Sequence, residues 1–300
     1  YTLYASEEYL RAGSLQERVE RWHDMALSLL KMYLKAFFTL HKKQWLSKNT
    51  KVDKLTESDV MQDKEYRLEV LPEQKTELLC QQLDKLKRKL EDDAAGNGEV
   101  IILPPKFKAV LFDRHLYQPL LSYPLKKGEK QEIPVSPVAL NESETEFLNA
   151  IMRYCKKQPQ ELQGYEMYLL RNKSKQGTGF FMNAGFYPDF IMWIVKGKKQ
   201  WISFIEPHGM LHEKGDVLSC DKVKLAHTIN DIEDVKKHKN LTLNSYIITP
   251  TPIKRIWPSI APKDDQEEAL RILHEHHLYA SEEGIDNVVK SIVGDVVGKN

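Results

Sequence analysis

The feature that most constrains this chain is a pair of apolar, strand-like runs joined by a short basic turn. The runs lie on either side of Lys196-Gly197-Lys198-Lys199, within residues 185–210, and both are rich in β-branched and aromatic residues. This pattern predicts a β-hairpin with the glycine at its turn. If the turn is centred between Gly197 and Lys198, residues equally distant from that centre lie opposite each other.

Two carboxylates occupy such opposite positions at the open end of the hairpin. Asp189 and Glu206 are equally distant from the turn, so their Cβ atoms are expected about 4.5–5.5 Å apart on one face. Side chains alternate along a strand, so His208 returns to the face of Glu206. Two carboxylates held this close repel each other unless a cation or a proton lies between them. A magnesium-class ion, which prefers oxygen ligands, is the expected solution.

The residues around these acids resemble a known family. Pro188-Asp189 followed by Glu206-Pro207-His208 resembles the PD-(D/E)XK nuclease signature, with histidine where the family usually has lysine. Three further segments resemble the C-terminal nuclease region of type III restriction subunits and related helicase–nuclease defence proteins: Asp113 to Leu121, Leu140 to Phe147 and Tyr168 to Asn172. The resemblance covers roughly residues 100–250. It implies an α/β restriction-endonuclease-like fold and a metal-dependent DNA endonuclease.

The resemblance also implies a set of metal ligands for Mg²⁺ or Mn²⁺. Asp189 and Glu206 are expected to bind the ion directly, and the backbone carbonyl of Pro207 is a further oxygen ligand. Glu144 matches the family's first acidic position, with Glu146 as a competitor for the role. Glu144 also lies three residues after Asn141, so it equally fits a helix-capping role.

Position 208 is where the chain departs from the family. The family lysine is a fixed cation, whereas a histidine with an ordinary pKa of about 6.5 is mostly neutral at pH 7. Two outcomes fit this change. One is a working nuclease with a variant site that includes His208 among its catalytic residues. The other is a degenerate nuclease-fold module that binds DNA or a partner subunit without cleaving.

Several other residues are candidates for contact with water or DNA. Gln200 falls on the Asp189 face and is predicted to orient water or nucleic acid, or else to be an ordinary polar edge residue. Lys196, Lys198 and Lys199 are predicted to touch DNA phosphates from the hairpin turn, although solvated surface is the alternative. Arg171 ends a predicted strand and fits either a phosphate contact or an ion pair with an acid.

Composition limits the remaining possibilities. The formal net charge is +1, which neither supports nor excludes DNA binding. No run of 18 apolar residues exists, so no membrane span is expected, and the three cysteines include no CxxC pair, which favours a reducing cytoplasm. The chain begins without methionine or a signal peptide, as a fragment would. A phosphate loop is absent, so any helicase motor is expected elsewhere in the full chain or complex, alongside a methyltransferase or other defence subunit.

Hydrophobic periodicity and proline positions divide the chain into four predicted regions. They are a helical module at 1–98, a β-rich connector at 99–141, a nuclease-like domain at 142–255 and a C-terminal helical tail at 256–300. Helices are expected at 15–47, 73–91, 142–156, 219–238, 264–277 and 282–297, with further strands at 165–171 and 241–249. The order helix, three strands, helix, strand predicts a small α/β domain with a mixed sheet flanked by helices.

Overall fold

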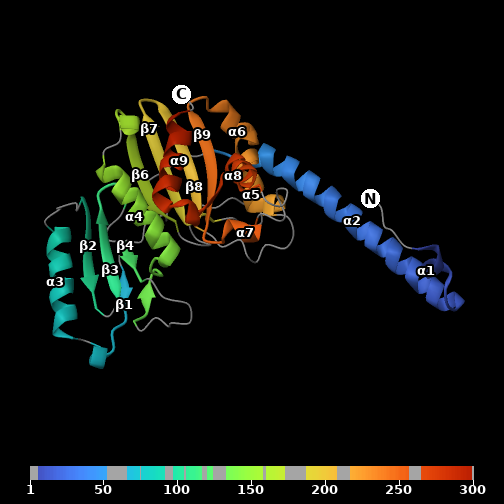
Figure 1. The fold of residues 1–300 in the computed structure, drawn as a ribbon, viewed down its shortest axis with the longest axis horizontal. Helices are drawn as coiled ribbons and strands as arrows, with labels where there is room; N and C mark the ends of the chain where they lie inside the picture. Colours follow the sequence, from blue (N-terminus) through green and yellow to red (C-terminus); the bar gives the residue numbers. More distant parts are fainter. Residues whose placement is uncertain are drawn as a thin grey trace.

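A five-stranded mixed sheet lies at the centre of the protein (Figure 1). Its order is β10-β9-β8-β7-β6. β6, β7 and β8 are antiparallel to one another, whereas β8, β9 and β10 are parallel. The strands are β6 (Glu166–Arg171), β7 (Phe190–Lys196), β8 (Lys199–Pro207), β9 (Leu241–Thr249) and β10 (Leu278–Ala280). The predicted α/β class with a mixed sheet is confirmed.

The structure is a computed structural model. It describes residues 6–52, 66–74, 76–91, 97–104, 106–116, 120–123, 133–157, 160–172, 187–207, 217–256 and 265–298. His208 therefore lies outside the described residues.

The register of the central hairpin is the one that the turn position predicts. Phe190 pairs with Ile205 and Lys196 pairs with Lys199, so the pairs are symmetric about the centre of the turn. The hydrogen bonds between β6 and β7 continue past the first residue of β7, because the backbone N–H of Asn172 donates to the carbonyl of Asp189 at 2.8 Å. Asp189 is thus held by the sheet although it precedes β7.

Helices cover both faces of the central sheet. α4 (Glu142–Lys156) and α9 (Ile285–Val297) pack on one face, where Phe147, Phe190 and Ile292 share a core. α5 (Asp221–Thr228) and α6 (Glu233–Lys237) cover the other face, where Leu225 and Val235 meet Ile191 and Phe204 of the hairpin. Alternation along β7 and β8 supplies both cores, because successive side chains point to opposite faces.

A second, three-stranded antiparallel sheet precedes the central one. It consists of β2 (Asn97–Leu103), β3 (Phe107–Phe112) and β4 (Leu120–Ser122). α3 (Glu77–Glu91) covers it, with Leu79 and Leu86 buried in the same core as Leu111. The predicted boundary at residue 98 is therefore wrong, because α3 buries its apolar stripe against the β-rich segment.

Short segments link the two sheets. After β3 the chain runs beside β6, where Leu116 N–H donates to Leu169 O at 3.0 Å and Leu169 N–H donates to Arg114 O at 2.9 Å. Two short strands, β1 (Arg67–Leu68) and β5 (Val135–Ser136), form a separate antiparallel pair.

The C-terminal residues belong to the main domain. α7 (Ile253–Ile256) and α8 (Gln266–Glu275) pack beside β9 and β10 through Ile253, Leu273 and Leu278. β10 forms the edge of the central sheet, and α9 fills the core beneath α4. The prediction of two terminal helices is confirmed, but the prediction of a separate tail is wrong. β10 escaped prediction because a three-residue strand has too few residues to show a period.

The N-terminal helix α2 (Leu15–Asn49) extends away from both sheets, with α1 (Glu7–Arg11) folded back against its start (Figure 1). The C-terminal end of α2 is held near α6, where Ser47 Oγ donates to the backbone carbonyl of Asp231 at 3.1 Å. Trp22, Phe38 and Trp45 are at least half exposed, so much of the apolar surface of α2 is uncovered among the described residues. None of the described helices is both long enough and apolar enough to cross a bilayer.

Candidate functional site

The candidate site lies at the end of the central hairpin opposite its turn. The paired residues of β7 and β8 end at Phe190 and Ile205, so Asp189 and Glu206 are the next residues outward on each strand. Their strand neighbours on the same face, Ile191 and Phe204, lie in the core beneath α5 and α6. Asp189 and Glu206 therefore share the α5 face of the sheet, as the sequence predicts.

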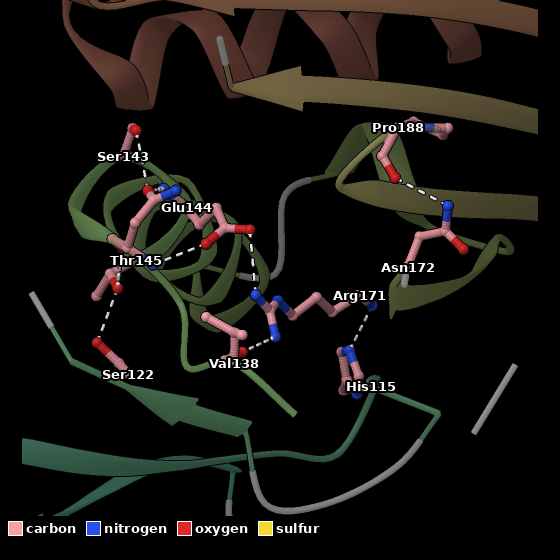
Figure 2. Close-up of polar contacts among 10 residues, drawn as sticks. His115, Ser122, Val138, Ser143, Glu144, Thr145, Arg171, Asn172 and Pro188 are labelled. Atoms are coloured by element: carbon pink, nitrogen blue, oxygen red, sulfur yellow. Dashed lines mark hydrogen bonds and ion pairs between the residues drawn. The ribbon is translucent and has the colours of Figure 1, made fainter. Parts of the chain in front are cut away.

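A third carboxylate reaches this end of the sheet from α4. Glu144 is only 5% exposed, whereas Glu146 is on the solvent side of the same helix. Its Oε2 accepts from the backbone N–H of Asn141 at 2.7 Å, which completes the capping box. Its Oε1 lies 3.4 Å from Nη2 of Arg171 (Figure 2). Glu144 thus caps α4 and also faces the site, because one of its oxygens points to Asn141 and the other to Arg171.

The pKa of Asp189 is raised by its burial and by the two neighbouring carboxylates. Burial is the main cause that raises the pKa of Asp189 to about 8, followed by the negative charges of Glu206 and then Glu144. The positive charges of Arg171 and Lys222 act in the opposite direction. A carboxyl with this pKa holds its proton at pH 7 until a cation takes the proton's place.

Two cations already hold two of the three acids. Lys222, on α5, places Nζ 2.6 Å from Oε1 of Glu206, and Glu206 is only 6% exposed. Arg171, at the end of β6, pairs with Glu144 and also donates to the carbonyl of Val138 (Figure 2). Three carboxylates and two cations leave one excess negative charge, and a proton on Asp189 makes the cluster neutral.

Asn172 and His115 hold the backbone around the site. Asn172 Nδ2 donates to the carbonyl of Pro188 at 2.9 Å, directly before Asp189. The backbone N–H of Arg171 donates to Nε2 of His115 at 2.8 Å (Figure 2). Both side chains are buried. They stabilise the chain at the ends of β6 and β7, and so position Arg171 and Asp189.

These supporting residues were not assigned a role from sequence. His115 and Asn172 lie within the family-like segments, but their hydrogen bonds join strands and loops that are distant along the chain. Lys222 was missed entirely, because it is one surface-type residue on a short helix. Only the packing of α5 over the sheet brings it to Glu206.

The structure places four predicted contact residues away from the carboxylates. Gln200 is six residues from Glu206 along β8, or about 20 Å at 3.3 Å per residue. Its assignment as a catalytic residue is therefore wrong. Lys196, Lys198 and Lys199 lie at the same turn, where Lys196 Nζ is 4.4 Å from the centre of the Tyr165 ring. Their contact with DNA stays a prediction, but they cannot touch a phosphate held by Asp189.

The predicted metal ligands are partly assembled. In the described part of the chain, no three His, Cys, Asp or Glu side chains form a group ready to hold a metal ion. Two of the acids face cations, since Glu144 pairs with Arg171 and Glu206 pairs with Lys222. The donor chemistry nevertheless fits a hard divalent cation, because the acids supply oxygen ligands and one uncompensated charge. Pro207 is buried at the end of β8 beside Glu206.

Comparison with known proteins adds no relative to this picture. No protein-family model, curated protein or solved structure matches the chain. Its function has to be inferred from the acids, the cations and the sheet that holds them.

Proposed function

We propose that this chain is a metal-dependent endodeoxyribonuclease domain of the PD-(D/E)XK type, which hydrolyses phosphodiester bonds in DNA. The observation that carries this proposal is the burial of Asp189 near the negative charges of Glu206 and Glu144, which together raise the pKa of Asp189 to about 8. Carboxyl groups with strongly perturbed pKa values gather at functional sites, because catalysis uses burial and neighbouring charges to shift pKa values.

The order of elements supports the same proposal. α4, then β6, β7 and β8, then the helical segment of α5 and α6, and then β9 follow one another along the chain and build one layered unit. This is the helix, three strands, helix, strand order that the resemblance implies. Glu144 comes from the first helix, Asp189 from the start of the second strand and Glu206 from the end of the third, which are the places where the family-like segments put them.

A divalent cation suits the charge of the cluster. With Asp189 ionised, three carboxylates and two cations carry a charge of −1, and a divalent ion changes it to +1. A centre with that charge attracts a phosphodiester, which carries −1. Bound Mg²⁺ or Mn²⁺ would supply a water of lowered pKa and stabilise charge on the phosphate oxygens. Asp189 and Glu206 would hold the ion, and Glu144 would act through water because Asn141 and Arg171 occupy its oxygens.

Lys222 supplies a positive charge that could replace the signature lysine, which is a histidine at position 208 in this chain. The family signature has a lysine two residues after the second acid, and this chain has His208 there. Lys222 places an ammonium group against Glu206 from a different element. We infer that Lys222 is a positioning residue, which orients Glu206 and keeps a positive charge beside it. Arg171 has the corresponding effect on Glu144.

The biological setting rests on the resemblance alone. The family-like segments favour a nuclease within a restriction or anti-phage defence helicase–nuclease. In that setting DNA is the substrate, a helicase motor and other defence subunits are the partners, and the cytoplasm is the compartment. Gating by the motor would protect host DNA from cleavage.

A second candidate function is a nuclease-fold module that binds DNA or a partner without cleaving. The ion pair between Lys222 and Glu206 favours it, because it neutralises an acid that a metal would otherwise require. Loss of the signature lysine at position 208 favours it as well. In this case the cluster would be a structural remnant with weak affinity for divalent ions.

The test combines cleavage with metal binding. Supercoiled plasmid and labelled linear duplex are incubated with Mg²⁺ or Mn²⁺ and with wild type, Asp189→Asn, Glu144→Gln or Glu146→Gln. Calorimetry measures Mn²⁺ affinity for the same four proteins. A nuclease predicts cleavage and metal binding that Asp189→Asn and Glu144→Gln reduce and Glu146→Gln leaves unchanged.

The other outcomes separate the two candidates. DNA binding without metal affinity or turnover would support the non-cleaving module. If Glu146→Gln and Glu144→Gln had the same effect, the buried cluster would not be the active site. Absence of both metal binding and DNA binding would overturn the proposal.

A further inference from the structure

A basic groove lies at the turn end of the hairpin, far from the carboxylates. It has a volume of about 1050 Å³ and is lined by the turn of β7 and β8, by α6 and by the loop that leads into β9. Trp193 and Ile202 are among its lining residues, and they point to the same sheet face as Asp189 and Glu206. The volume is in the range of clefts that bind small organic ligands.

The cationic side chains of this groove have little counter-charge. Lys198, Lys237, His238 and Lys239 line it, and its lining includes no Asp or Glu among the described residues. Lys237 pairs with Asp234 at 3.2 Å, and His238 Nε2 lies 4.0 Å from the same carboxylate. Lys198 and Lys239 are exposed, and within the described structure neither makes an ion pair. Two fixed ammonium groups are therefore available to an anionic ligand.

The groove also offers an aromatic surface and two amides. Trp193 is partly exposed and packs against the apolar core beneath α6. Gln200 and Asn240 are joined through their backbones, with Gln200 N–H donating to Asn240 O at 2.8 Å, and both side chains are exposed. A stacking platform, paired cations and amides that donate and accept are the groups that bind unpaired nucleotides. An acidic peptide would be bound through the cations alone and would make no use of the aromatic surface or the amides.

We propose that this groove binds single-stranded nucleic acid, with a base stacked on Trp193 and backbone phosphate against Lys198 and Lys239. The ligand is single-stranded because a base within a duplex stacks on its neighbours and does not offer its face to an indole. Gln200 and Asn240 contact the edges of the bases. The role predicted for Gln200 at the carboxylates is thereby replaced by one in this groove.

The position of the groove suggests how it would serve the proposed nuclease. About 20 Å separates Gln200 from Glu206 along β8, which is about six nucleotides at the rise of a B-form strand. The groove would then hold one strand of an opened substrate while the carboxylates act on DNA about that far away. This link to cleavage rests on the proposed function, whereas the binding of single strands does not.

The test measures binding without cleavage. Fluorescence anisotropy in EDTA follows a labelled oligothymidine of about 15 nucleotides, a length that suits one such site. The variants are Lys198→Ala/Lys239→Ala and Trp193→Leu. The control is Lys85→Ala/Lys87→Ala, which removes two exposed lysines from α3. Intrinsic tryptophan quenching is recorded in parallel, and Trp193→Leu identifies the contribution of that residue.

The proposal predicts a different result for each variant. Lys198→Ala/Lys239→Ala should weaken binding about tenfold and reduce the salt slope by about 1.4, the value for two lost phosphate contacts on a single strand. Trp193→Leu should weaken binding at least about fivefold with an unchanged salt slope, because it removes stacking alone. The α3 control should change neither quantity.

Three results would overturn the inference. Equal weakening by the groove and α3 variants would mean that binding follows net charge. Equal competition by polyglutamate of matched charge would show a simple anion site. Loss of binding in Asp189→Asn, with binding retained in Lys198→Ala/Lys239→Ala, would place the strand at the carboxylates. That last result would overturn the groove proposal and leave the proposed nuclease intact. Binding in the groove without any metal-dependent cleavage would support the groove proposal and count against the nuclease.

Discussion

The ammonium group of Lys222 on α5 lies 2.6 Å from Oε1 of Glu206 at the end of β8. This pair joins a helix to the sheet at the point where three carboxylates converge. Glu206 is almost fully buried, so its charge is compensated by the neighbouring helix more than by water. The contact between Lys222 and Glu206 therefore affects both the stability of the fold and the charge of the carboxylate cluster.

Replacing Lys222 with methionine should separate these two effects. Lys222→Met leaves a buried carboxylate without its cation, which costs about 3–5 kcal/mol for a fully buried pair. Because Lys222 is partly exposed, we expect about 1–3 kcal/mol, measured as a lower free energy of unfolding in urea. If Lys222 positions Glu206 for catalysis, kcat should fall much more than KM rises.

A neighbouring lysine on the same helix provides the control. Lys224→Met removes an exposed lysine two residues away and should change neither stability nor cleavage. The double variant Lys222→Met/Glu206→Gln should recover most of the lost stability, because no unpaired buried carboxylate remains at position 206. Equal effects of Lys222→Met and Lys224→Met would show that the ion pair has no special role.

The raised pKa of Asp189 predicts how the metal-free protein responds to pH. Its folded pKa of about 8 exceeds the ordinary value of 3.8, so the folded state binds the proton more tightly than the unfolded state. As far as this group is concerned, stability should be highest below about pH 3.8, and should fall as pH rises from there to about 8. One proton sets the upper limit of this slope at about 1.4 kcal/mol per pH unit.

Asp189→Asn tests the assignment of this pH dependence. The amide cannot ionise, so the variant should lose the slope between pH 5 and 8 and should be the more stable protein at pH 9 in EDTA. Chemical denaturation at a series of pH values gives both quantities. A slope that persists in Asp189→Asn would assign the proton to another group.

Glu144 and Arg171 should shift the titration of Asp189 in opposite directions. Glu144→Gln removes a negative charge that raises the pKa of Asp189, so that pKa should fall. Arg171→Met removes a positive charge that lowers it, so the pKa should rise. The midpoint of the pH-dependent stability change reports both shifts. Glu146→Gln is the matched control, and the cluster would be misassigned if it moved the midpoint as far as Glu144→Gln.

Asn172 should control the position of Asp189 through the backbone. Asn172→Asp keeps the shape of the side chain but cannot donate to the carbonyl of Pro188 when ionised. The lost hydrogen bond and the added negative charge should destabilise the fold by about 1–3 kcal/mol. Asn172→Ala should destabilise it less, and should weaken Mn²⁺ binding because Asp189 is held less firmly. Unchanged metal affinity in Asn172→Ala would restrict Asn172 to a structural role.

Local patterns were sufficient to predict the hairpin and α4. The Lys196–Lys199 turn sets the register of β7 and β8, because a short turn leaves one way to pair two strands. Asn141 and Glu144 mark the start of α4 through contacts only three residues apart. From this register and this cap follow the shared face of Asp189 and Glu206 and the first-turn position of Glu144.

The roles of distant residues could not be predicted in the same way. α3 has a clear apolar stripe, yet a stripe does not say which sheet it covers. The alternation of β8 places Gln200 on the face of Glu206, but six residues of strand separate the two by about 20 Å, and only the groove beside α6 shows what lies near Gln200. β10 joins the sheet through parallel pairing with β9, which depends on a crossover connection that includes α7 and α8.

The sequence by itself determined which acids share one end of the hairpin, because alternation and turn position act between near neighbours. Only the tertiary structure decided how their charges are compensated. Lys222 reaches Glu206 from α5, and Arg171 reaches Glu144 across the end of β6. These contacts join residues that packing brings together, and the electrostatic energy of a buried site depends on distances in space rather than along the chain.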